Sequence, residues 1–257
     1  MCGIFGCVLK EGNAAPFIRS SLKRLEYRGY DSVGIATISD GKIWLKKDQG
    51  KIDDVNKIMN LDDLPGRIGI GHTRWATHGA PLKVNAHPHN DCAGEIVVIH
   101  NGIIENYLEL RSELQGLDHS FVSRTDTEVI PHLIEQVLKQ NPELPFVNAV
   151  QESVKRLEGS YALAVISTKE PDKIFCARNE SPLVLGVSDM GVFCASDIPA
   201  FLPLTNKAVM VNNGEFVVLS AEGYEIKRLQ DLSPIARSRR LLSGRLKWLS
   251  RKVIRIL

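Results

Sequence analysis

The stretch MCGIFGC (residues 1–7) constrains the fold more than any other part of this chain. Directly behind Cys2, the apolar residues 4–8 predict a buried strand that fixes the end of the chain in the core. Gly3 has no side chain, so the backbone there can approach a ligand closely. The sequence therefore predicts a chain end held inside the folded body, with a thiol at its second residue.

The thiol of Cys2 has a possible base on its own backbone. Aminopeptidases remove Met1 when the next residue is small, and Cys2 would then carry a thiol and a free α-amino group on one carbon. The ordinary pKa values are about 8.5 for a thiol and about 7.7–8.0 for an α-amino group, so the amine can accept the thiol proton near neutral pH. An N-terminal nucleophile activated by its own amine is an established arrangement. The alternative interpretation is an ordinary small residue at a frayed end.

Length and composition indicate a soluble globular protein. The 257 residues suit one large or two small domains, with 44% hydrophobic and 24% charged residues. No apolar run approaches the roughly 18–20 residues that span a bilayer, and the start lacks the pattern of a signal peptide. Five scattered cysteines without C-x-x-C spacing argue against a disulfide framework or a zinc site. We therefore expect a cytoplasmic protein with reduced thiols and no association with membranes.

The net charge of +2 hides an asymmetry. No acidic residue follows Asp231, but eight basic residues do: Arg237, Arg239, Arg240, Arg245, Lys247, Arg251, Lys252 and Arg255. Without these eight, 24 Lys and Arg residues stand against 30 Asp and Glu residues, a net charge of −6. A body of this charge repels a phosphate backbone, so we expect no binding of nucleic acid.

The last 25 residues differ in character from the rest, so we expect a body at 1–232 and a separate tail at 233–257. The tail is a basic amphipathic helix by its pattern, with apolar positions on one face at Leu242, Leu246, Leu249, Val253 and Leu257. Such helices are typical of membrane surfaces and of acidic partners. The alternative is a truncated or shifted reading frame whose residues were never selected.

Hydrophobic periodicity and turn residues divide the body into short elements. Strands are expected at 3–9, 33–38, 42–47, 68–72 and 95–100, and then at 161–167, 173–178, 182–187, 191–195, 207–212, 215–220 and 224–228. Helices are expected at 14–26, 51–60, 106–114, 129–138, 146–157 and, as a short one, 197–202. Thr125 or Asp126 can cap the helix that begins near 129. Two strand-rich halves predict sheet packed on sheet, with helices outside.

Four residue positions could bind a free α-amino acid. Asn101 and Gly102 follow the strand at 95–100, where an amide side chain and a backbone N–H could form an oxyanion hole. Arg74 could hold a carboxylate through two hydrogen bonds, and Asp126 could hold an ammonium group. The alternatives are a common Asn-Gly turn, a surface arginine and a helix cap.

Histidines 72, 78, 87 and 89 lie in one polar stretch, HTRWATHGAPLKVNAHPH (72–89). Their spacing is irregular, and no carboxylate or thiol stands at an expected offset, so we expect no metal. Trp75 in the same stretch is interpreted as packing against its own loop, with stacking on a ligand as the alternative.

Nine segments of the body, in order and at matching spacing, resemble the glutaminase domains of the glutamine–fructose-6-phosphate aminotransferases, within the class II, N-terminal-nucleophile glutamine amidotransferases. They are MCGIFG (1–6), RLEYRGYDS (24–32), HTRWATHG (72–79), NAHPH (85–89), HNGIIEN (100–106), TDTEV (125–129), EGSYALAVIS (158–167), ARNESPLVLG (177–186) and ASDIPAFLPLT (195–205). The resemblance covers about residues 1–230. It implies an α+β fold, a four-layer αββα sandwich with two stacked, mostly antiparallel sheets.

The resemblance also implies roles in cleaving the side-chain amide of L-glutamine. Cys2 would attack the amide, and its α-amino group would move the proton. Asn101 and Gly102 would hold the oxyanion, while Arg74 and Asp126 would bind the α-carboxylate and α-ammonium groups. The remaining implied residues are Trp75, Thr77 and His78 on a loop that closes over glutamine, and Arg28, which would orient the Cys2 end. No cofactor and no metal is implied.

Full-length members of this family continue into sugar-isomerase domains that use fructose 6-phosphate and make glucosamine 6-phosphate for hexosamine synthesis. This chain lacks a recognisable site for a sugar phosphate. The resemblance therefore leaves open a separate isomerase chain as partner. The alternative to an active glutaminase is a catalytically idle remnant, or a regulatory subunit that binds glutamine.

Overall fold

The computed structural model describes residues 2–75 and 82–235 of the chain. The predictions for Thr77, His78 and the helix of the tail lie outside these residues. None of the helices in the described part has the length and apolar content that crossing a bilayer requires.

Two antiparallel sheets form the centre of the molecule. The seven-stranded sheet has the order β11 (Ala208–Met210), β9 (Val184–Ser188), β10 (Gly191–Ala195), β1 (Gly3–Leu9), β4 (Ile68–Arg74), β2 (Ser32–Ser39) and β3 (Lys42–Gln49). The six-stranded sheet has the order β13 (Gly223–Arg228), β12 (Glu215–Ser220), β8 (Ile174–Asn179), β7 (Gly159–Ser167), β6 (Ile96–Ile104) and β5 (His89–Asn90). The N-terminal strand β1 thus lies in the middle of its sheet, between β10 and β4.

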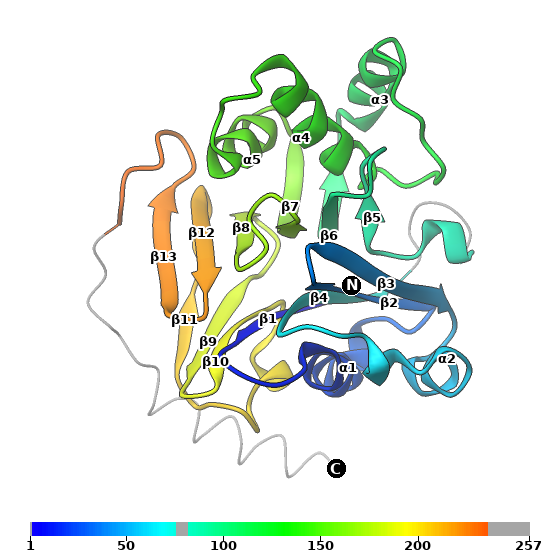
Figure 1. Cartoon of the computed structure of the whole chain (residues 1–257), viewed down its shortest axis with the longest axis vertical. Helices are drawn as coiled ribbons and strands as arrows, with labels where there is room; N and C mark the ends of the chain where they lie inside the picture. The colour runs from blue at the N-terminus through cyan, green and yellow to red at the C-terminus, as the bar shows by residue number, and fades with distance from the viewer. Residues whose placement is uncertain (1, 76–81, 236–257) are drawn as a thin grey trace.

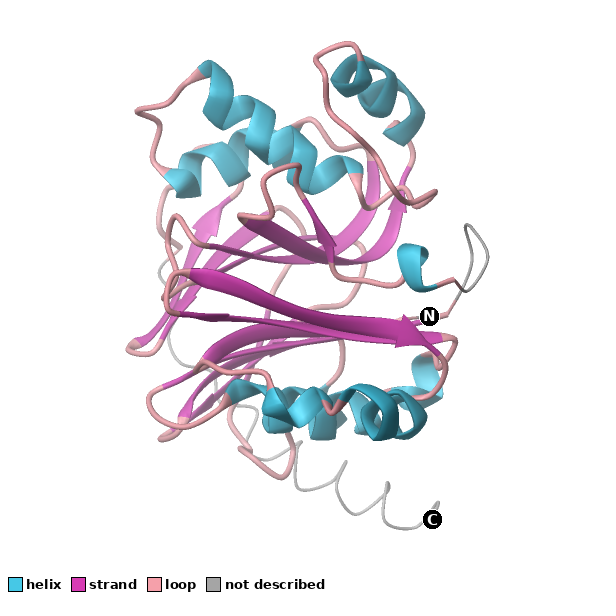
Figure 2. Ribbon diagram, turned by 45° about the vertical axis from the view of Figure 1, so that its right-hand side comes forward, coloured by secondary structure: helices cyan, strands magenta, loops and turns pink. Residues whose placement is uncertain are grey.

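Helices cover the outer face of each sheet, so four layers result (Figures 1 and 2). The seven-stranded sheet carries α1 (Ala14–Arg24) and α2 (Ile52–Met59). The six-stranded sheet carries α4 (Val129–Gln140) and α5 (Phe146–Lys155), with α3 (Tyr107–Gln115) packed beside α4. Short 3-10 turns occur at η1 (Glu26–Arg28), η2 (Leu61–Asp63), η3 (Lys83–Asn85) and η4 (Ile198–Ala200).

Three buried apolar clusters hold these layers together, and β1 contributes to two of them. Ile4 and Val8 point into the cluster between the sheets, where they meet residues of β6 such as Ile99. Phe5 and Cys7 point to the opposite side, toward α1. Because strand side chains alternate between faces, a strand buried on both faces must be apolar throughout. This explains why residues 4–8 are continuously buried and confirms the strand predicted there.

The predicted four-layer αββα sandwich is confirmed, while several element boundaries differ from the prediction. The strand expected at 95–100 continues to Ile104 in β6, so Asn101 and Gly102 lie within a strand and not in a turn after it. The helix expected at 197–202 is the single 3-10 turn η4. The two-residue strand β5 was not predicted, because two residues carry no periodic signal.

Candidate active site

Three donors fix Cys2 at the entrance of β1. Its carbonyl oxygen accepts hydrogen bonds of 3.0 Å from Arg28 Nε and of 3.0 Å from Asn101 Nδ2. Its sulfur accepts a hydrogen bond from the backbone N–H of Trp75, at 3.2 Å. The donors come from the turn after α1, from β6 of the other sheet and from the end of β4. The thiol therefore lies where the two sheets and a turn meet.

Arg28 is itself held in place by a neighbouring carboxylate. The side chain is buried, and its Nη1 lies 3.2 Å from Asp197 Oδ2, which also accepts a 2.6 Å hydrogen bond from the hydroxyl of Tyr27. A Cβ on Gly29 would lie 2.6 Å from the backbone nitrogen of Trp75, so only glycine lets this turn pack against the end of β4. The segment RGY thus presents the guanidinium of Arg28 to the Cys2 carbonyl.

The amide of Asn101 is oriented by a buried histidine. His72 Nε2 lies 3.0 Å from Asn101 Oδ1 and 3.1 Å from the carbonyl oxygen of His100. Both neighbours are acceptors, so Nε2 carries the hydrogen and donates it. With Oδ1 accepting from His72, the NH₂ group of Asn101 faces Cys2, which is the direction an oxyanion donor needs.

Gly102 occupies a backbone conformation that excludes other residues. Its φ is +131°, and an added Cβ would lie 2.0 Å from the carbonyl oxygen of Ser160 on the neighbouring strand β7. A side chain here would push β6 away from β7. The glycine therefore allows the strand to continue past Asn101, and Gly102 lines the pocket that contains the Cys2 thiol.

Asp126 does not cap α4, and neither does Thr125, so the prediction of a cap at these residues is wrong. Asp126 Oδ2 instead accepts a 2.9 Å hydrogen bond from the backbone N–H of Ile104, which ties the segment before α4 to β6. Thr125 Oγ1 bonds Ser123 Oγ and His89 Nε2. The N-cap position belongs to Glu128, without a side-chain cap.

Glu128 organises the segment that carries Asp126. Its carboxylate accepts hydrogen bonds from the N–H groups of Val122 and Ser123, at 2.8 and 2.7 Å, and from the Ser123 hydroxyl at 2.6 Å. Burial alone would raise the pKa of Glu128, but these hydrogen bonds and His132 lower it to about 2. A carboxylate that stays ionised in this position fixes residues 122–128 as one rigid turn.

One pocket brings most of the predicted site residues together. It is lined by Cys2, Arg74, Trp75, Gly102 and Asp126, together with His87, His100, Thr125 and Thr127. Asn101 reaches the same place through the Cys2 carbonyl, whereas Arg28 lies behind Cys2. The roles assigned to these residues remain predictions.

Burial and the surrounding charges act on the Cys2 thiol in opposite directions. Burial is the larger effect and raises the pKa of the thiol, while the N–H of Trp75 and the charges of the N-terminus, Arg74 and Arg28 lower it. Arg74 is buried at the end of β4, and burial lowers its pKa, opposed by the negative charges of Cys2, Asp126 and Asp31. The indole of Trp75 is 44% exposed and meets the ring of Tyr30 edge-on at 5.7 Å.

Behind the pocket, four histidines fill the space between the sheets. His72 and His87 stack at 4.1 Å between ring centroids, and His89 meets His87 edge-on at 4.8 Å. His87 Nδ1 accepts from the backbone N–H of His100, whose own Nδ1 lies 2.9 Å from Thr127 Oγ1. Burial lowers the pKa of all four rings, so they are neutral at pH 7.

Sequence reasoning missed two residues of this site. Asp197 lies 169 residues from Arg28 in the sequence and forms an ion pair with it. The residues around Asp197 indicated only the start of a short helix. His72 was considered as a metal ligand, but in the structure it orients Asn101. His72 is the fifth residue of a strand that is buried throughout. This position was the one sign in the sequence that its side chain makes hydrogen bonds inside the protein.

Comparison with known proteins identifies the family. Residues 72–203 match the family model described as a glutamine amidotransferase domain. The chain belongs to this family. The glutamine–fructose-6-phosphate aminotransferase (isomerizing) of Methanothermobacter thermautotrophicus is 54% identical over 222 residues, 86% of this chain and 37% of that protein. The enzyme of the same name from Pyrococcus horikoshii is 53% identical over 227 residues, 88% of this chain and 38% of that protein.

Solved structures agree with this assignment of the amidotransferase domain. Glutamine phosphoribosylpyrophosphate amidotransferase from B. subtilis superimposes with a TM-score of 0.75 at 28% identity, over 89% of this chain and 49% of that one. The predicted resemblance to N-terminal-nucleophile amidotransferases is thereby confirmed. The chain spans less than two fifths of the length of the two aminotransferases described above.

The buried histidines predict a loss of stability in mild acid. Burial lowers the pKa of His72 to about 3, against about 6.5 in an unfolded chain. Between these values the unfolded chain binds a proton that the folded chain does not, so the free energy of unfolding falls as the pH falls. We expect a slope of about 1.4 kcal/mol per pH unit for each such ring, measured by urea unfolding at about pH 7.5, 6 and 5.

His72→Gln is the matched variant for this test, because it removes one titrating ring and keeps a hydrogen-bond donor. The free energy of unfolding of this variant should depend less steeply on pH than that of the wild type. The difference should correspond to the uptake of about one proton fewer on unfolding. A wild-type stability that stays constant or rises between pH 7 and 5 would contradict the neutral state of these rings.

Proposed function

We propose that this amidotransferase domain hydrolyses the side-chain amide of L-glutamine to glutamate and ammonia through a thioester on Cys2. The observation that carries the proposal is the pocket that combines the Cys2 sulfur, the Arg74 guanidinium, the Gly102 backbone and the Asp126 carboxylate. A nucleophile, an oxyanion donor and two opposite charges for an α-amino acid are the parts that amide transfer from glutamine needs.

The first step forms the thioester. After removal of Met1, the α-amino group of Cys2 takes the thiol proton, and the sulfur attacks the amide carbon of glutamine. The carbonyl oxygen becomes an oxyanion, which the NH₂ group of Asn101 and the N–H of Gly102 stabilise. The carbon–nitrogen bond then breaks, and the α-ammonium group gives its proton to the departing nitrogen, which leaves as ammonia. Arg28 holds the Cys2 carbonyl and so fixes the direction of the amine.

The second step regenerates the enzyme. The α-amino group, neutral again, takes a proton from water, and the resulting hydroxide equivalent attacks the thioester carbon. The carbon–sulfur bond breaks, glutamate leaves, and the proton returns to sulfur. The histidines behind the pocket are neutral and so add no further positive charge near the amine, which must lose its proton to act as base.

Recognition of glutamine rests on its two α-substituents. Arg74 is proposed to bind the carboxylate and Asp126 the ammonium group, because both are buried in the described structure and both line the pocket. A buried arginine makes charge-assisted hydrogen bonds that a substrate without a carboxylate cannot satisfy. Trp75 forms part of the rim. Thr77 and His78, which lie outside the described residues, are also proposed to bind glutamine.

The names of the relatives point to the fate of the ammonia. They are isomerizing aminotransferases for fructose 6-phosphate, and this chain matches little more than a third of each. We propose that the domain supplies ammonia to a sugar-isomerase unit that makes glucosamine 6-phosphate, either joined to it or on a separate chain. A catalytically idle domain that only binds glutamine is the second candidate, and a glutaminase assay separates the two.

Replacing Cys2 by alanine should abolish turnover. The Cys2→Ala variant keeps the fold and the pocket but has no sulfur to form the thioester, so glutamate release should fall to background. A second variant with an uncleavable N-terminal extension keeps the thiol and blocks the amine. It should be slower by about 10²-fold or more, the usual contribution of a general base. Unchanged turnover in Cys2→Ala would exclude the proposed mechanism.

Replacing Arg74 by lysine should weaken binding of glutamine. Lysine keeps the charge but loses the paired N–H groups, at a cost of about 1.5–3 kcal/mol, so kcat/KM should fall roughly 10- to 100-fold, mainly through KM. Arg67→Lys is the control, because Arg67 is exposed just before β4 begins, at the end away from the pocket. Equal effects of the two substitutions would contradict the assigned role of Arg74.

A further inference from the structure

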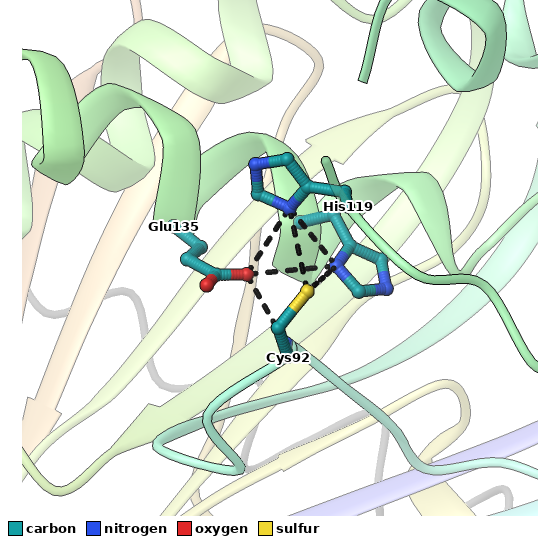
Figure 3. Close-up of side chains that lie close together, drawn as sticks. Cys92, His119 and Glu135 are labelled. Atoms are coloured by element: carbon teal, nitrogen blue, oxygen red, sulfur yellow. Dashed lines mark hydrogen bonds and ion pairs between the residues drawn. The ribbon is translucent and has the colours of Figure 1, made fainter. Parts of the chain in front are cut away.

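A group of four potential metal ligands lies away from the thiol pocket. Cys92 lies in the connection between β5 and β6, His119 follows α3, and His132 and Glu135 lie on α4. Figure 3 shows Cys92, His119 and Glu135 pointing toward one another. His132 and Glu135 are three residues apart on one helix, a spacing that places both on the same face. Three separate segments of the chain thus contribute to one cluster.

Five of the six distances between the ligand atoms are close to the edges of a metal tetrahedron, and the sixth, between Cys92 and Glu135, is at most 4.8 Å. The Cys92 sulfur lies 3.6 Å from His119 Nδ1 and 3.4 Å from His132 Nδ1, and the two nitrogens are 3.3 Å apart. Glu135 Oε2 lies 3.2 Å from His119 Nδ1 and 3.6 Å from His132 Nδ1. A tetrahedral zinc ion has bonds of about 2.0–2.3 Å, so its ligand atoms are separated by about 3.3–3.7 Å.

Two of these ligands, His119 and Glu135, have outer atoms whose partners orient the atoms that point into the cluster. His119 Nε2 lies 3.0 Å from Gln136 Oε1 and donates to it, which leaves the lone pair on Nδ1 directed into the cluster. Glu135 Oε1 pairs with Lys139 at 2.8 Å, while Oε2 lies in the cluster and also accepts a 3.1 Å hydrogen bond from the backbone N–H of Cys92. His132 Nε2 faces the carboxylate of Glu128 at 3.9 Å. Metal-binding histidines commonly present their second nitrogen to an amide or carboxylate in this way.

Burial makes this convergence costly without a cation. The side chains of His119 and His132 are 0% and 1% exposed, and that of Glu135 is 10% exposed. Without a cation, few hydrogens are available for the nitrogen, sulfur and oxygen atoms that converge in this buried place, and an unsatisfied buried polar atom is costly. A hydrogen bond from a histidine to Glu135 is the alternative arrangement, and it would leave the thiol without a comparable role.

We propose that Cys92, His119, His132 and Glu135 form a closed tetrahedral site for Zn²⁺. One thiolate, two imidazoles and one carboxylate are ligands that zinc prefers, and four protein ligands leave no open position. The site is therefore structural and independent of the proposed glutaminase chemistry. Cys92 is exposed at the surface, which provides a path for the ion to enter. The expectation of no metal considered other histidines and looked for C-x-x-C spacing, which this cluster lacks.

The ion would connect α4 to the turn that begins β6. Asp91 Oδ1 accepts from the N–H groups of Glu95 and Ile96 and so holds Cys92 at the head of this turn. The strand that follows carries Asn101, and the segment before α4 carries Asp126. A zinc ion at the cluster would therefore fix two elements that both reach the thiol pocket.

Metal content and cobalt absorption test this site directly. The untagged full chain should retain about one zinc ion after dialysis, and replacement by Co²⁺ should give the visible absorption of a tetrahedral site with a thiolate-to-cobalt charge-transfer band. Added zinc should raise the Tm. In Cys92→Ser the charge-transfer band should disappear, and in Glu135→Gln zinc should be lost at lower chelator concentration. Both variants should retain the circular dichroism of the folded chain.

Cys2→Ala is the matched control, because Cys2 is another accessible thiol and lies outside the cluster. This variant should keep its zinc and its cobalt spectrum. A wild-type chain that retains no zinc and shows no thiolate-to-cobalt band would overturn the site. So would a band that survives in Cys92→Ser or disappears in Cys2→Ala.

Discussion

The hydrogen bonds that Arg28 and Asn101 donate to the Cys2 carbonyl are the interaction on which the proposed chemistry depends. Chain ends normally fray, and an N-terminal nucleophile is useful only if its amine and sulfur keep a fixed direction. One donor is charged and is anchored by Asp197, and the other is anchored by His72. Four residues from four parts of the chain thus hold a single peptide group, two by direct hydrogen bonds and two by anchoring those donors.

The two sheets meet at this peptide group, which links the fold to the site. β1 begins directly after Cys2 in one sheet, and β6 carries Asn101 and Gly102 in the other. The apolar cluster between the sheets, which includes Ile4 and Ile99, sets their separation. Neutral histidines fill the space behind the thiol. One of them, His72, orients the amide of Asn101 by a hydrogen bond, which an apolar side chain could not do. The packing of the core therefore also aligns the groups that are proposed to be catalytic.

The sequence predicted much of the fold, because continuous apolar runs such as residues 4–8 identify buried strands. It also predicted that Cys2, Arg74 and Asp126 would come together, through the resemblance of their motifs. Contacts between distant segments were not predictable in this way. Asp197 supports Arg28, and Cys92 meets His119 and His132, only because the tertiary fold brings them together. The end of β6 was misjudged because Asn101 and Gly102 resemble a turn, whereas pairing with β7 continues through both.

The most direct test of the account is the mass of the chain after treatment with a glutamine analogue that carries a diazoketone in place of the amide. The account predicts that Met1 is absent and that one adduct forms, on the peptide that begins with Cys2, and that excess glutamine slows its formation. A folded, turnover-competent chain that retains Met1, or that is modified only at another residue, would contradict the central role of the processed N-terminal cysteine.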